Sequence, residues 1–201
     1  MLVMVAAIAA RGQGFLNLNF ESAYNLPGNP GNNGTSVAIA NALPDWTAYQ
    51  GDLALFNVYY ASNNFSGTSS AVGLEGGSLA LSGNFSAALY DGGSISQTGL
   101  VPTNAGSLQF EASSALNLQV FLNGQSLPYS AISGGPGYTV YGANIPGGLD
   151  GQTETLTFGM GSGETLLDDI QFINVPEPSE YALIGLGAIL FGFRYCKRVG
   201  L

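Results

Sequence analysis

The sequence predicts an all-β protein, a jelly-roll-like β-sandwich followed by a single C-terminal transmembrane helix. Between residues 15 and 174, apolar and polar residues alternate over short stretches that Gly, Asn and Pro separate, which is typical of strands joined by turns. No window of twelve residues before Tyr181 has helical periodicity. Only 8% of the 201 residues are charged and 30 are glycine, a composition that suits tight turns and argues against helical bundles.

The alternation places strands along the whole body. They are expected at residues 15–20, 53–60, 78–81, 85–90, 107–112, 116–122, 125–129, 138–144, 153–158 and 166–173. Asn123-Gly124 supplies the two positive φ angles of a type I′ turn and predicts a hairpin. Loops rich in Gly, Asn and Pro are expected at 25–34 and 134–137. Roughly eight to eleven such strands without helices favour a sandwich of jelly-roll type.

The N-terminus predicts a secretory signal peptide in residues 1–14. Residues 2–10 form an apolar run followed by small residues, but the usual positive charge before the run is missing. Either the true start lies further upstream or the signal is weak. Cleavage could follow Ala9 or Gly14, and Gly14 is favoured because a strand then opens the mature chain at Phe15. The alternative is an N-terminal core strand or helix.

The C-terminus predicts a membrane helix over residues 181–193 and a basic tail over 194–201. Thirteen helical residues rise only ~20 Å, which is less than the ~30 Å of the hydrocarbon core of a bilayer. By length alone, the segment is more typical of a buried core helix than of a membrane span. The run is followed at once by Arg194, Lys197 and Arg198, whose long side chains can snorkel to the interface. Their position favours a span with the cations held on the cytoplasmic side.

Charge separates the body from the ends. All four basic residues lie at the two ends, whereas residues 15–174 carry eleven acids (thirteen minus Glu177 and Glu180) and no Lys or Arg. Nucleic acid is therefore excluded as a partner, because binding it needs cations that neutralise phosphates. The chain contains no His and has its single Cys at position 196, which excludes a Ser-His-Asp triad and a thiol nucleophile in the body. No spacing of carboxylates selects a glycosidase pair, so the body is predicted to be non-enzymatic.

Residues 175–201 combine Val175-Pro176-Glu177-Pro178-Ser179, a short apolar helix and a basic tail. This order of parts closely resembles the PEP-CTERM sorting signal. The resemblance implies that Pro176, Glu177 and Pro178 are recognised by exosortase, a membrane-embedded cysteine protease that processes its substrates during export in bacteria that make exopolysaccharide. The chain would be the substrate of that protease. The alternative is a plain single-pass anchor.

The body resembles, more loosely, the galactose-binding-like jelly rolls, a group that includes many carbohydrate-binding modules. The resemblance depends on three short motifs, one that ends at Glu21, one around residues 120–124 and one at residues 167–170. The resemblance implies a structural Ca²⁺ ion held by Glu21 with Asp168 or Asp169, and carboxylate oxygens are suitable ligands. Adjacent strand residues point to opposite faces, so only one of the two aspartates could face such a site directly. Exposed strand-end carboxylates are the alternative.

Trp46 and Tyr49 are the candidate carbohydrate-binding residues, because aromatic faces flanked by polar side chains stack on sugar rings. A single Trp in a small sandwich is more often part of the core, since it buries a large apolar area. Together these features predict an exported, non-enzymatic bacterial protein, anchored in the membrane and placed at the cell surface or in the extracellular matrix after processing. Its body would be structural or associated with extracellular polysaccharide; the alternative is a lectin-like module with a structural calcium site.

Overall fold

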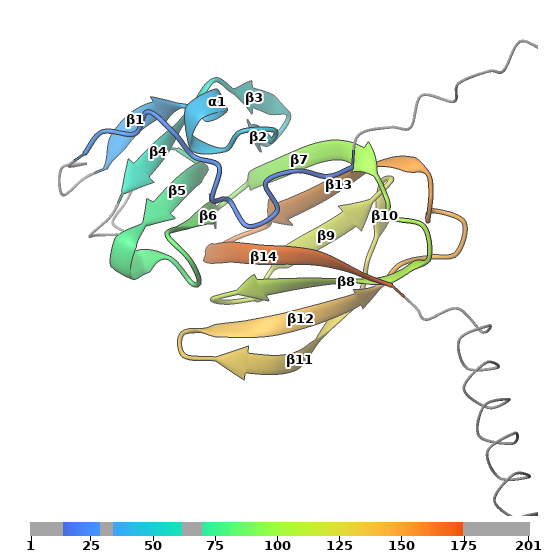
Figure 1. Cartoon of the computed structure of the whole chain (residues 1–201). Helices are drawn as coiled ribbons and strands as arrows, with labels where there is room; N and C mark the ends of the chain where they lie inside the picture. The colour runs from blue at the N-terminus through green and yellow to red at the C-terminus, as the bar shows by residue number, and fades with distance from the viewer. Residues whose placement is uncertain (1–13, 29–33, 62–69, 175–201) are drawn as a thin grey trace, which may run out of the picture.

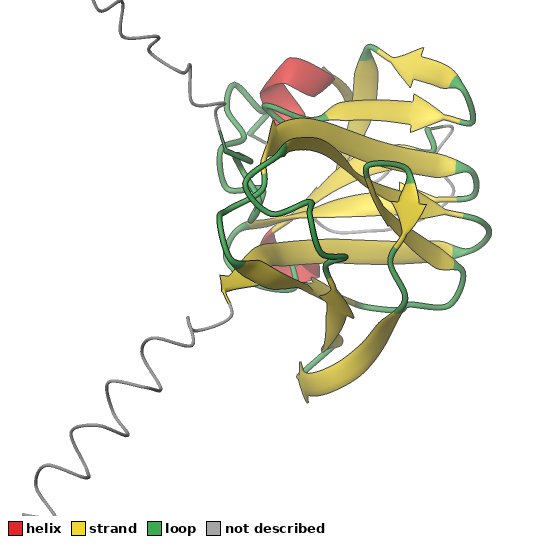
Figure 2. Cartoon of the chain, turned by 90° about the vertical axis from the view of Figure 1, so that its right-hand side faces the viewer, coloured by secondary structure: helices red, strands yellow, loops and turns green. Residues whose placement is uncertain are grey.

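The computed structural model describes residues 14–28, 34–61 and 70–174, and in these ranges the chain folds into two β-sheets with two short helical turns (Figures 1 and 2). The turns are α1 (Ile39–Ala42) and the 3-10 helix η1 (Gly77–Leu79). The all-β prediction is confirmed. The strand expected at 78–81 is wrong: η1 occupies its first half, and residues 81–84 form bends.

The eight-stranded sheet contains, in spatial order, β1 (Thr35–Ala38), β4 (Asn57–Ala61), β5 (Val72–Gly76), β6 (Phe85–Tyr90), β14 (Glu164–Asn174), β8 (Ala105–Ala112), β12 (Tyr138–Asn144) and β11 (Tyr129–Gly135). All its neighbouring pairs are antiparallel except β4 and β5. In Figure 1 its last four strands follow one another toward the lower edge of the molecule.

The six-stranded sheet contains, in spatial order, β10 (Gln125–Ser126), β9 (Leu118–Leu122), β13 (Thr153–Met160), β7 (Gly93–Leu100), β2 (Thr47–Gln50) and β3 (Leu53–Leu55). From β6 to β9, and again from β12 to β14, successive strands alternate between the two sheets. This alternation lets both sheets share one core, so the predicted β-sandwich is confirmed.

The core lies between the sheets and is built from alternate residues of both. Phe110 of β8 meets Phe158 of β13 edge to face, with ring centroids 5.2 Å apart, and both are fully buried. Tyr129 and Tyr141 pack on Phe110 with centroids 5.4 and 5.6 Å away. Aromatic contacts of this kind add to the area that the rings bury. The phenylalanine pair therefore joins the two layers at the centre of the sandwich.

The predicted hairpin is confirmed at its turn. Asn123 and Gly124 have φ angles of +52° and +70° and join β9 to β10, as a type I′ turn requires. The sequence did not reveal that β10 stops at Ser126 and that the chain then crosses to the other sheet as β11. Leu127, which is buried, anchors this crossing.

Two further expectations differ from the structure. The stretch 53–60 is not one strand: it breaks at Phe56, which is 85% exposed, because β3 and β4 belong to different sheets. The stretch 15–20 is not a strand. Gly14, the residue before it, forms an isolated bridge with Leu100. Asn17 and Phe20 have φ angles of +47° and +57°, which break the extended backbone and turn Phe20 into the core.

Candidate functional site

A row of polar residues crosses the outward face of the eight-stranded sheet. Register pairs Glu75 of β5 with Ser86 of β6, and Asp168 of β14 with Glu111 of β8. Ser86 donates its hydroxyl to Asp168 Oδ2 at 2.6 Å, which joins the two pairs. The neighbouring row points the opposite way, into the core; it consists of Leu74, Ala87, Leu167 and Ala112. The acidic row is thus on the face away from the core, yet all four of its members are buried.

The segment between β5 and β6, residues 77–84, covers this row, and we call it the strap. Its base is closed by a hydrogen bond from the Gly77 amide to the Asn84 carbonyl at 3.2 Å. The Leu81 amide donates to Ser86 Oγ at 2.8 Å, and the Ser82 amide donates to Asp168 Oδ2 at 3.3 Å. A strap residue is therefore bonded directly to Asp168, and a second reaches it through Ser86.

Glu21 holds the other side of the strap. Its Oε1 accepts hydrogen bonds from the amides of Asn84 at 2.6 Å and Phe85 at 2.9 Å, and its Oε2 accepts one from Asn84 Nδ2 at 2.8 Å. Partial burial alone would raise the pKa of Glu21, but these three bonds outweigh it and lower the pKa below its ordinary value. Gly83 has a φ of +60°, a left-handed conformation that favours glycine, and a Cβ there would displace the Glu21 carboxylate.

The structure brings two of the three predicted calcium ligands to one segment. Glu21 and Asp168 both bind the strap, while Asp169 lies in the bulge of β14 with a φ of +42° and accepts a bond from Gln171 Nε2 at 2.7 Å. The carboxylate oxygens of Glu21 and Asp168 face N–H and O–H donors. Among the described residues, no three acidic side chains are arranged to hold a metal ion. The calcium site stays a prediction.

Burial dominates the electrostatics of the acidic row. Glu75 is 2% exposed, its Oε1 lies 3.5 Å from the Tyr90 hydroxyl, and its Oε2 has no hydrogen-bond partner. Burial raises the pKa of Glu75 to about 8; the nearby charge of Glu164 adds to this effect, and the hydrogen bond from Tyr90 opposes it. Burial also raises the pKa of Asp168 to about 6, against the effect of its hydrogen bonds. Glu75 is therefore largely a neutral acid at pH 7.

Glu111 is the second buried acid with an orphaned oxygen. It is 8% exposed and its Oε2 has no partner. Burial raises its pKa and the charge of Asp169 raises it further, while side-chain hydrogen bonds from Ser82 and Tyr138 act in the opposite direction. The described ranges 14–28, 34–61 and 70–174 contain no Lys, Arg or His. The described ranges therefore offer no salt-bridge partner to these acids.

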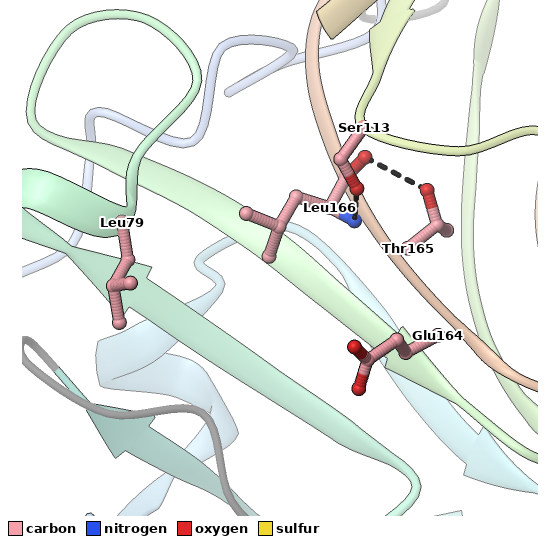
Figure 3. A pocket seen from close by; sticks show the side chains of 5 residues that line it. All are labelled: Leu79, Ser113, Glu164, Thr165 and Leu166. Atoms are coloured by element: carbon pink, nitrogen blue, oxygen red, sulfur yellow. Dashed lines mark hydrogen bonds between the residues drawn. The ribbon is translucent and has the colours of Figure 1, made fainter. Parts of the chain in front are cut away.

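A small pocket opens beside the strap. It has a volume of about 190 Å³ and is lined by Leu79, Ser113, Glu164, Thr165 and Leu166. Figure 3 shows Leu79 of the strap on one side and the residues of β14 on the other. The Leu166 amide donates to Ser113 Oγ at 2.9 Å, and the Thr165 hydroxyl is within bonding distance of two carbonyl oxygens. The pocket therefore offers mainly leucine side chains, with Glu164 at its margin.

Trp46 is a core residue, which is the alternative that the sequence favoured, so its ring is not exposed for the candidate role of stacking on a sugar. It is 4% exposed, its Nε1 donates to the Asn17 carbonyl at 3.0 Å, and its ring packs on Phe20 at 5.6 Å between centroids. Trp46 is buried because removing its large apolar surface from water stabilises the fold. Tyr49 remains available. It is half-buried on β2, with small residues, Ala54 and Ser94, opposite it on both neighbouring strands.

Sequence reasoning missed the hydroxyl-rich outward face of the six-stranded sheet. Thr47, Ser96 and Thr157 form one row across β2, β7 and β13, and Phe121 of β9 continues it. In the next row, the hydroxyls of Thr98 and Thr155 are 2.8 Å apart. The signal was present in the alternating hydroxyl residues of 94–98 and 153–157. We call this surface, with Tyr49, the hydroxyl face.

Several predicted functional residues lie outside the described ranges. These are Pro176, Glu177 and Pro178 of the sorting motif, the helix 181–193 with Arg194, Lys197 and Arg198, and nearly all of the signal peptide. Within the described ranges, neither helical turn has the length or the apolar character to cross a bilayer. Comparison of the chain with family models, curated proteins and solved structures found no match.

Proposed function

We propose that the chain is an exported, non-enzymatic protein of the bacterial cell surface or extracellular matrix. Its residues 175–201 would be read by exosortase as a sorting signal, and its body would be structural or associated with polysaccharide. The observation that carries this proposal is the completeness of the sandwich before the signal begins. Strand β14 ends at Asn174, and the Pro-Glu-Pro motif starts two residues later.

The positions of Gly14 and Asn174, the two ends of the described body, support export and anchoring at one side of it. Gly14 bridges Leu100 at the end of β7, and Asn174 pairs with Ala105 at the start of β8. Residues 100 and 105 flank the same turn, so both ends of the described body leave the sandwich at one end. A signal peptide and a C-terminal anchor could then both engage a membrane without crossing the body.

The strand order supports a jelly roll as the finer description of the sandwich. The central strands run β6-β14-β8-β12 in one sheet and β7-β13-β9-β10 in the other. Consecutive strands cross between the sheets as in two linked Greek keys. β1, β4, β5 and β11 extend the first sheet, and β2 and β3 extend the second. A rigid body of this kind, without a disulfide, suits a structural role outside the cell.

Deletion of residues 175–201 is expected to abolish membrane or surface retention and to release the body. The measurement is fractionation of the host cells by immunoblot. A Glu177→Ala variant separates sorting from plain anchoring, because it alters the motif and leaves helix and tail intact. We expect it to remain at the membrane at its unprocessed mass. Normal processing of Glu177→Ala would contradict the exosortase assignment, and unchanged fractionation of the deletion variant would contradict the anchor as well.

The second candidate function is a lectin-like module, which the hydroxyl face favours. Its Ser and Thr hydroxyls can exchange hydrogen bonds with sugar hydroxyls, and the half-exposed ring of Tyr49 lies at one side. Residues 15–174 contain eleven acidic residues and no basic residue, and this negative charge would repel an anionic polymer. The chemistry therefore favours a neutral polysaccharide.

Binding of the full chain to an array of neutral glycans checks this candidate. If the hydroxyl face binds, Tyr49→Ala should weaken the signal at least tenfold, because stacking on the ring is lost. Tyr138→Ala removes a half-buried aromatic ring from β12 in the other sheet and should leave binding unchanged. Saturable binding that both variants reduce equally would place the glycan site elsewhere, and no binding at all would leave the structural role.

A further inference from the structure

We propose that two copies of this chain associate edge to edge through β11 (Tyr129–Gly135), about a two-fold axis beside Ile132. The inference goes beyond the proposed function and does not depend on it. Three observations carry it: β11 is the longest edge strand of the described sandwich, it lies in an uncharged part of a strongly acidic body, and its central residue is an exposed isoleucine.

Strand β11 has one side of its backbone open. It is the last strand of the eight-stranded sheet, it pairs only with β12 among the described strands, and it forms the lower border of the described body in Figure 1. The other edge strands, β1, β3 and β10, have four, three and two residues, whereas β11 has seven. A row of open N–H and C=O groups is a template for pairing with another chain, and short edge strands limit such pairing. Of the four edges, β11 is therefore the best able to accept a further strand.

β11 also lacks the side chains that usually protect an edge. It contains no charged residue and no proline, and its residues 130–134 are exposed. A bulge between Ala131 and Ser133 interrupts its register with β12 at Ile132, so regular backbone pairing is limited to residues 129–131 and 133–135. The contact is therefore expected to combine two short ladders with a side-chain contact between them.

Ile132 provides that central contact. It is 52% exposed, and its side chain lies against Gly142 of β12, where a Cβ would be 3.3 Å from Ile132 Cγ2. Because Ile132 is the middle residue of β11, a two-fold axis beside it brings the same side chain of both copies together. Removing two isoleucine side chains from water would favour the association.

The distribution of charge favours a second copy as the partner. Residues 15–174 contain eleven acidic residues and no basic residue, so two copies repel each other in most orientations. Residues 112–149, which form β9, β10, β11 and β12, contain none of these acids. Inward from β11, the first acid of the sheet is the buried Glu111 on β8, two strands away. A two-fold contact pairs this edge with itself and brings uncharged surfaces together, whereas a basic partner would be attracted to the acidic strands instead.

Sedimentation velocity of the full chain in detergent solution tests the proposal. We expect an equilibrium between monomer and closed dimer at micromolar concentrations. Ile132→Glu places like charges opposite each other at the two-fold axis and should raise the dissociation constant of the dimer by about tenfold or more. Leu53→Glu is the matched control, because it adds the same charge to an aliphatic residue that is 74% exposed on β3, an edge strand of the other sheet. It should leave the dissociation constant unchanged.

Hydrogen exchange followed by mass spectrometry locates the contact in the unaltered protein. Peptides that cover residues 129–135 should gain protection as the concentration rises, and peptides that cover β1, the opposite edge of the same sheet, should not. A chain that stays monomeric would overturn the proposal, as would assemblies that grow beyond the dimer, equal weakening by the two variants, weakening by neither, or equal protection at both edges. If Ile132→Glu does not fold, the contrast in exchange between the two edges still decides the question.

Discussion

Replacement of Phe110 by alanine is expected to lower the free energy of unfolding by about 3–5 kcal/mol. Phe110 is fully buried, and its ring contacts Phe158, Tyr129 and Tyr141 at centroid distances of 5.2 to 5.6 Å. Replacement by alanine would lose the free energy that burial of the ring contributes. It would also leave a cavity that the packed strands on both sides cannot close. Denaturant unfolding followed by far-ultraviolet circular dichroism measures the change.

Phe56→Ala is the control for this prediction, because it removes the same atoms from a side chain that is 85% exposed. Its effect should stay within about 0.5 kcal/mol. Equal destabilisation by the two variants would mean that Phe110 is not at the junction of the two sheets. A loss below about 1 kcal/mol for Phe110→Ala would lead to the same conclusion.

Replacement of Gly93 by alanine should be at least as damaging, through overpacking. A Cβ at this position would lie 1.9 Å from the carbonyl oxygen of Ala71 and 2.8 Å from its carbonyl carbon. Both atoms belong to the backbone, so no side-chain rotation can relieve the contact. Gly93 opens β7 in one sheet, and Ala71 precedes β5 in the other. The variant would have to separate the sheets there, and we expect a loss above the 1–3 kcal/mol typical of overpacked cores.

Gly159→Ala is the matched control, on the neighbouring strand of the same sheet. Its Cβ would meet only the Ser94 Cβ, at 3.6 Å, which is an ordinary contact. Thermal unfolding of both variants distinguishes steric conflict from a general intolerance of side chains in this sheet. If Gly159→Ala were as unstable as Gly93→Ala, the close approach of Ala71 would not be the cause.

Some strands could be predicted from the sequence with their bounds, and others were missed. The predictions at 85–90 and 138–144 match β6 and β12 residue for residue. β5 was missed because it is Val-Gly-Leu-Glu-Gly, buried at every position, so it shows no alternation. β7 was missed for a related reason. Gln97 occupies a core-facing position, where its side chain bonds the backbone of Leu16 and Asp45 and breaks the apolar pattern.

The candidate sites divide in a similar way. The resemblance to galactose-binding-like jelly rolls groups Glu21 with Asp168 or Asp169; the structure brings Glu21 and Asp168 to one strap and leaves Asp169 in the bulge of β14. Neither Glu75 nor Glu111 could be recognised as buried, because polar residues on an outward strand face normally lie in solvent. Only the path of residues 77–84 back across the sheet covers them.

The all-β class, the type I′ hairpin and the separation of an acidic body from basic ends could all be read from the amino-acid sequence. Local alternation, turn chemistry and charge are properties of neighbouring residues and need no knowledge of the fold. The division of 53–60 between two sheets and the burial of the acidic row beneath a strap became apparent only from the three-dimensional arrangement of the strands. These features arise from contacts between residues far apart in the chain, and burial by a distant segment leaves no mark on the local pattern that it covers.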